Sequence, residues 1–79
     1  MTKQYIAIIS TEKHGENAFN TANKINSDSF HGLTHSSIDD FWNHYNIECE
    51  CIMTNLFCLM LNNSEIDTEN NYFAQIKID

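Results

Sequence analysis

The chain has 79 residues and a net charge of −7, with four lysines, no arginine and eleven acidic residues. Nucleic-acid backbones and anionic membrane surfaces both bind through cationic side chains, so this composition argues against direct nucleic-acid binding and against a membrane partner. A chain of this length is expected to form a single domain, residues 1–79, that buries only about 60% of its unfolded surface.

The hydrophobic content favours a folded protein that stays in the cytoplasm. Hydrophobic residues make up 42% of the chain, which is enough for a packed core. The apolar run near the N-terminus, Tyr5 to Ile9, is too short for a signal peptide, and no run approaches the ~18 residues of a membrane span. Three cysteines are an odd number, which is typical of reduced thiols in a cytosol.

The first third of the chain predicts a strand followed by a helix. Residues 3–11, KQYIAIIST, are rich in β-branched and aromatic side chains, which predicts an internal strand. Residues 15–26 predict a helix, because four apolar residues recur there at helical spacing: Ala18, Phe19, Ala22 and Ile25. Residues 27–35 then predict a loop with Gly32 at a turn.

A second helix follows, with Ser36 or Ser37 as its N-cap. Asp39 and Asp40 occupy its first turn, where each carboxylate stabilises a helix by roughly 0.3–1 kcal/mol. This local role and a role in partner binding are equally compatible with the sequence. One apolar face is formed by Ile38, Phe41, Trp42 and Tyr45.

The C-terminal half predicts two strands around an ambiguous segment. Residues 47–53, IECECIM, alternate as in a half-buried strand, with Glu48 and Glu50 on the face opposite Cys49. Residues 54–63 favour a helix capped by Thr54, although a strand after a hairpin turn stays open. Residues 71–78, NYFAQIKI, again alternate as in a strand.

These elements predict an α+β domain of order β-α-α-β-α-β. We expect its helices to pack on one face of a small, mainly antiparallel sheet. We also expect the first and last strands to share this sheet, which places the two chain ends close together.

The cysteines and histidines do not have the spacing of a metal or catalytic site. The pair Cys49 and Cys51 is not a CxxC motif, and His31 and His35 lie in a predicted loop. A Cys58–His44 pair could act in nucleophilic catalysis, but no enzyme motif accompanies it. We therefore expect no enzymatic activity, no cofactor and no metal, with a Cys/His metal-binding protein as an alternative.

The segment SEIDTENN carries Glu65, Asp67 and Glu69 at alternate positions. It lacks the glycine and the ligand offsets of an EF-hand loop, so calcium binding is not expected. A solvated acidic loop or a contact with a partner is the better interpretation.

The distribution of charge is the most informative feature. Residues 25–76 contain eight of the eleven acidic residues and no lysine or arginine. Glu48 and Glu50 would stand about 6.6 Å apart on one side of an extended chain, and duplex DNA carries a phosphate per about 3.4 Å on each strand. This spacing is compatible with nucleic-acid mimicry, although any exposed strand with acids at i and i+2 has it. A surface of one sign favours a basic partner.

The short length, the absence of arginine, the asparagine-rich composition and the acidic stretch IECE are similar to those of small anti-defence proteins of phages and mobile elements. Anti-CRISPR and anti-restriction proteins are examples. The resemblance is one of general character across the chain and involves no family motif. It implies a non-enzymatic inhibitor in the cytoplasm of a bacterial host, bound to a basic nuclease or surveillance complex. By implication its contacts would be Asp39, Asp40, Glu48, Glu50, Glu65, Asp67 and Glu69.

A third class of function stays open beside the inhibitor and the Cys/His metal-binding protein. A small regulatory protein could form a homodimer through the apolar face of the predicted helix, Leu56 to Leu61.

Overall fold

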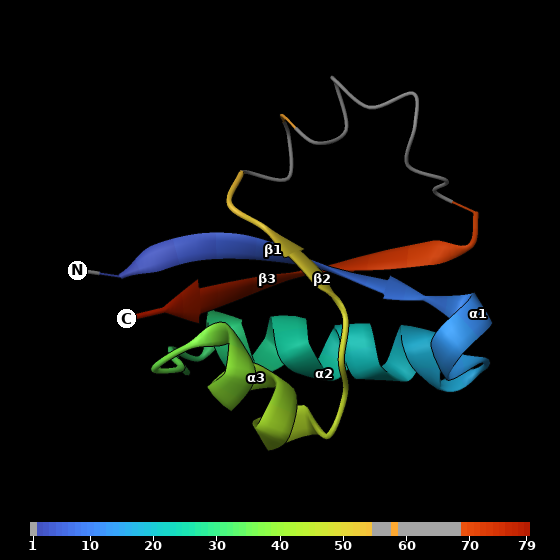
Figure 1. Cartoon of the computed structure of the whole chain (residues 1–79), viewed down its shortest axis with the longest axis horizontal. Coiled ribbons are helices and arrows are strands. Elements are labelled where there is room, and N and C mark those ends of the chain that lie inside the picture. The colour runs from blue at the N-terminus through green and yellow to red at the C-terminus, as the bar shows by residue number, and fades with distance from the viewer. Residues whose placement is uncertain (1, 55–57, 59–68) are drawn as a thin grey trace.

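The computed structural model contains a three-stranded sheet with its helices below it (Figure 1). It describes residues 2–54, 58 and 69–79. The strands are β1 (Lys3–Ser10), β2 (Glu50–Ile52) and β3 (Asn71–Ile78), in the spatial order β2-β1-β3. Both pairings are antiparallel, so the predicted α+β class is confirmed.

The first and last strands pair along their full length. β1 and β3 run in register from Lys3 opposite Ile78 to Ser10 opposite Asn71. The two chain ends therefore meet, and the Thr2 hydroxyl donates a hydrogen bond to a carboxylate oxygen of Asp79 at 3.2 Å. The strands predicted over 3–11 and 71–78, and their shared sheet, are confirmed.

After β1, the helical part of the chain extends further than predicted. A one-turn helix, α1 (Thr11–His14), is capped by the Ser10 hydroxyl and ends at Gly15, whose φ of 59° suits glycine. Helix α2 (Asn17–Phe30) continues four residues past the predicted end at 26. Ser29 explains the difference: it is only 6% exposed and extends the buried stripe of α2.

Helix α3 (Ile38–Tyr45) forms where the second helix is predicted. Ser37 is its N-cap, and its hydroxyl accepts a hydrogen bond from the backbone N–H of Asp40 at 3.1 Å. The helix ends at Asn46, which adopts the left-handed conformation. Phe41 is fully buried and anchors the helix to the core.

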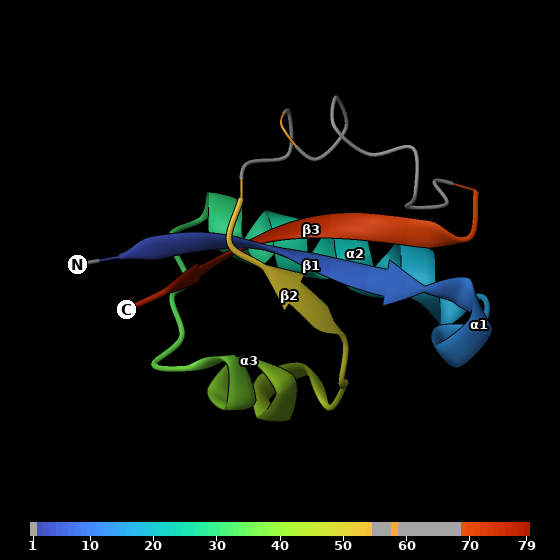
Figure 2. The same cartoon turned by 45° about the horizontal axis from the view of Figure 1, so that its top comes forward.

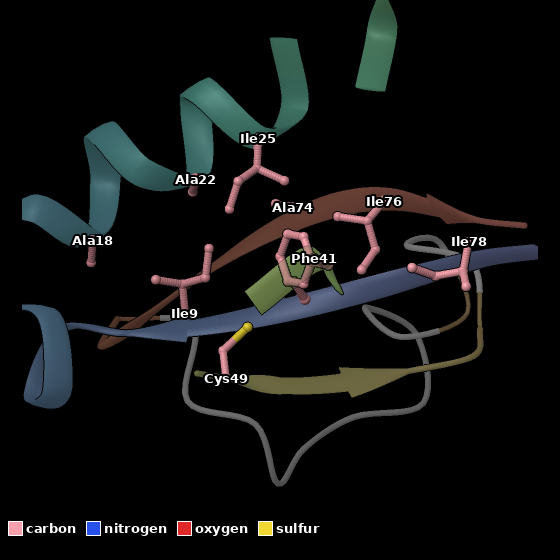
Figure 3. Packing of buried hydrophobic residues seen from close by; sticks show 10 residues of the cluster. Ile9, Ala18, Ala22, Ile25, Phe41, Cys49, Ala74, Ile76 and Ile78 are labelled. Atoms are coloured by element: carbon pink, nitrogen blue, oxygen red, sulfur yellow. The ribbon is translucent and has the colours of Figure 1, made fainter. Parts of the chain in front are cut away.

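The core lies between the sheet and the two longer helices (Figure 3). Ile9 and Ala74 point from the strands toward α2, and Phe41 enters from α3. Helices α2 and α3 lie on the same side of the sheet, as predicted: Figure 1 shows both below the strands, and in Figure 2 the strands pass in front of α2. Ile6 and Ile8 alternate to the other side of β1 and are also buried, so β1 is an internal strand on both faces.

Strand β2 is shorter than predicted. It covers Glu50–Ile52, whereas the sequence predicts a strand over 47–53. Residues 47–49 are held by α3 instead. The N–H of Ile47 donates to the carbonyl of Trp42 at 3.0 Å, and the indole N–H of Trp42 donates to the carbonyl of Cys49 at 3.2 Å. The helix predicted over 54–63 lies outside the described residues, apart from Thr54 and Cys58.

Candidate functional site

Glu48 and Glu50 are the two carboxylates that the structure brings together most clearly. Between them, Cys49 is only 8% exposed, and its carbonyl is held by the Trp42 indole. Because side chains alternate along an extended chain, the buried Cys49 turns both of its neighbours outward. Both glutamates are exposed. The predicted orientation of this pair is therefore confirmed.

The pair lies at one edge of the sheet. Glu50 pairs with Ile8 at the start of β2, which is an edge strand. Cys51 packs against the core on the helix side, so the Glu50 side chain is on the opposite face of the sheet. A carboxylate at this place is accessible to a partner that approaches the β2 edge.

Helix α1 brings basic residues to the same place. Lys13 and His14 line a cavity of about 170 Å³ together with Glu48 and Glu50. The Nε2 atom of His14 is buried and has no hydrogen-bond partner. The local charge is therefore less negative than the lysine-free stretch 25–76 indicates, because folding returns a lysine from the beginning of the chain.

Asp39 and Asp40 lie at the other end of α3. The backbone N–H of Ser36 donates a hydrogen bond to the Asp40 carboxylate at 3.3 Å, so Asp40 contributes to the cap of the helix. Asp39 is exposed in the same turn. An eight-residue helix is about 12 Å long, and this length separates the two aspartates from Glu48.

The remaining predicted contacts lie in the connection before β3. Glu69 is exposed, two residues before that strand begins, while Glu65 and Asp67 lie outside the described residues. Two pairs of carboxylates from the predicted contact set, Glu48 with Glu50 and Asp39 with Asp40, thus lie at different ends of α3. A single contact set of seven residues stays a prediction.

A polar and aromatic cluster beneath α3 could not be recognised from the sequence. The hydroxyl of Tyr45 donates a hydrogen bond to the Asp28 carboxylate at 2.6 Å, and burial, together with this contact, raises the pKa of Tyr45. His35 is 4% exposed, with its ring against those of Phe41, His44 and Tyr45. No sequence motif links these residues, because they come from α2, α3 and the loop between them.

Burial lowers the pKa of His35 below its ordinary value of 6.5, and the nearby His44 lowers it further. The carboxylates of Asp40 and Asp28 act in the opposite direction. His35 is therefore held neutral inside the fold, where it connects the loop to β3. The backbone N–H of His35 donates to the Lys77 carbonyl at 2.9 Å, and the backbone carbonyl of His35 accepts from the N–H of Asp79 at 2.8 Å.

The cysteine pair is close but is not part of a larger ligand cluster. The Cys51 thiol donates to the carbonyl of Cys49 at 3.8 Å. The neighbouring Cys51 side chain and burial raise the pKa of the Cys49 thiol, while the Cys49 side chain lowers the pKa of the Cys51 thiol. Among residues 2–54, 58 and 69–79, no group of three His, Cys, Asp or Glu side chains could hold a metal ion. Metal binding by the Cys and His residues stays an alternative prediction.

The catalytic Cys58–His44 pair and the homodimer through the face Leu56 to Leu61 also stay predictions. The contacts that the structure shows for the His44 ring are with His35 and Tyr45, and a Cys58–His44 pair is not among them. Most of the apolar face from Leu56 to Leu61 lies outside the described residues.

No helix in the described part of the chain is both long enough and apolar enough to cross a membrane. Comparisons with family models, with curated proteins and with solved structures find no match to this chain.

Proposed function

We propose that this protein is a non-enzymatic inhibitor that docks on a basic, nucleic-acid-handling protein or complex, as anti-CRISPR and anti-restriction proteins do. The observation that carries the proposal is the exposed pair Glu48 and Glu50, presented on either side of the buried Cys49 at a sheet edge. The partner's lysine and arginine groove, built to hold phosphates, would receive these carboxylates and thereby lose its nucleic-acid ligand.

The electrostatics of the whole chain support such a partner. A net charge of −7 steers a basic protein toward this molecule and repels acidic ones. Cα atoms two residues apart in an extended chain are about 6.6 Å apart, close to twice the phosphate spacing along one DNA strand. Glu48 and Glu50 are the described carboxylates with this arrangement.

Asp39 and Glu69 are secondary contacts in this proposal. Both are exposed, and Asp39 lies at the other end of α3 from the Glu48 and Glu50 pair. Asp40 has a local task at the cap of α3, so its substitution would change folding together with binding. A test of docking therefore belongs at the β2 edge.

The test is a charge reversal at Glu48 and Glu50. We predict that the double variant Glu48→Lys and Glu50→Lys loses the protein that the natural chain captures from a bacterial lysate, because repulsion replaces attraction. The melting temperature should change little, since both side chains are exposed. Immobilised chains and mass spectrometry of the retained proteins give the readout.

The matched control is the double variant Glu12→Lys and Glu16→Lys, which changes the net charge by the same amount at two other exposed positions. This control should retain the captured protein. Equal loss from both variants would mean that net charge alone causes capture, and undiminished capture by the Glu48 and Glu50 variant would reject the β2 edge as the docking site.

A further inference from the structure

A second surface of the molecule is built differently from the acidic edge. Helix α2 and strand β3 enclose a cavity of about 520 Å³, lined by Ser29, Phe30, Gln75, Lys77 and others. β3 is the edge strand opposite β2, with β1 between them, so this cavity lies across the sheet from Glu48 and Glu50. Whatever binds here need not compete with a partner at the β2 edge.

The backbone of β3 is largely closed to another strand. The side-chain amide of Asn26 donates to the Phe73 carbonyl at 3.1 Å and accepts from the Gln75 N–H at 2.8 Å. Further along, His35 pairs with the backbone of Lys77 and Asp79. A continuous added strand would have to displace these contacts. Docking at this surface must therefore occur through side chains.

Phe30 is the side chain that stands out at this surface. It is 86% exposed, although α2 buries the residue before it. Its ring contacts that of His31 edge to face, with the ring centres 5.5 Å apart. Phe30 also forms part of the cavity wall. An apolar knob and a hollow thus lie side by side on one surface, which is the arrangement that a two-fold axis makes self-complementary.

Charge also favours a second copy at this cavity over the cavities whose walls contain Glu12, Glu48 or Glu50. Two chains of −7 repel each other, and the repulsion is smallest where the touching surfaces carry no acids. The cavity wall contains no Asp or Glu, and Lys77 is its one charged residue among those described. Amide and hydroxyl groups of Gln4, Gln75 and Ser29 supply the rest of its polar surface.

We propose that this protein forms a symmetric homodimer in which Phe30 of each copy enters the cavity between α2 and β3 of the other. Burial of two phenylalanine rings drives the association. The dimer leaves both β2 edges exposed on its outer sides, and so presents two Glu48 and Glu50 pairs. This inference does not depend on the proposed inhibitory function, because it concerns the opposite edge of the sheet.

The test is sedimentation equilibrium of the full chain over a range of concentrations. We expect a dimer whose dissociation constant rises at least tenfold in Phe30→Ala. The variant Phe19→Ala is the matched control, because Phe19 is 52% exposed on the same helix but packs against Tyr72, away from the cavity. It should dimerise as the natural chain does.

A second variant examines the hollow without changing the knob. Gln75→Trp places a large side chain in the cavity and should also weaken the dimer at least tenfold. Circular dichroism checks that each variant is folded. A natural chain that stays monomeric up to about 1 mM, a weak dissociation constant, would overturn the proposal, and so would a dimer that neither substitution weakens.

Discussion

At the scale of single residues, His35 is a titratable group that the fold holds on several sides. It is surrounded by aromatic rings, it faces His44, Asp40 and Asp28, and its backbone joins the loop before α3 to β3. A proton on this ring would place a charge where the fold excludes water. Acid should therefore destabilise the protein through this residue.

The sign of the effect follows from the lowered pKa of His35. The unfolded chain binds this proton more readily than the folded one, so the contribution of His35 to stability is fully present above about pH 6.5 and declines as the pH falls below that value. We predict that His35→Phe reduces this decline between pH 7 and 5.5. Urea unfolding at a series of pH values measures the slope.

His31→Phe is the control, because His31 is exposed and lies in the same loop. It should keep the slope of the natural chain. If His35→Phe and the natural chain lose stability in parallel over this pH range, His35 is not the group responsible.

At the scale of secondary structure, Ser37 determines where α3 begins. Its hydroxyl accepts the N–H of Asp40, while the Asp40 carboxylate accepts the N–H of Ser36. We predict that Ser37→Ala lowers the free energy of unfolding by about 1 kcal/mol. Ser36→Ala should change it far less, since Ser36 contributes its backbone and not its hydroxyl. Equal effects in urea titrations would contradict this assignment of the cap.

The elements that the sequence predicts well are those whose signals are local. β1 is rich in β-branched and aromatic residues, β3 alternates within its own residues, and α3 carries its cap beside its apolar face. The sequence predicts an end of α2 that is too early, because Ser29 is polar and only its packing against the sheet shows that it is buried. β2 is shorter than its sequence predicts, because the Trp42 indole holds the Cys49 carbonyl away from the pairing with β1.

The candidate site follows the same division. The outward orientation of Glu48 and Glu50 could be predicted from alternation alone, and the structure bears it out. The approach of Lys13 and His14 could not, because it depends on the pairing of β1 with β2. Phe30 falls in the segment predicted as a loop. Nothing in the sequence indicates that it lies at the end of a helix beside a cavity.

At the scale of the whole molecule, the two edges of the sheet have opposite characters. The β2 edge presents carboxylates, and the β3 edge presents Phe30 beside a hollow whose described wall contains Lys77 and no acidic residue. Salt should therefore act on the two proposed associations in opposite directions. It should weaken docking on a basic partner by screening attraction, and strengthen the homodimer by screening the repulsion between two chains of −7.

Competition with DNA tests the central claim, that the acidic β2 edge takes the place of a nucleic acid, most directly. A protein captured from a bacterial lysate by the immobilised natural chain is washed with duplex DNA of increasing concentration, at constant salt, and the released fraction is measured. We predict release by DNA, because both ligands would occupy one basic groove. Retention that duplex DNA does not alter at any concentration would contradict the account.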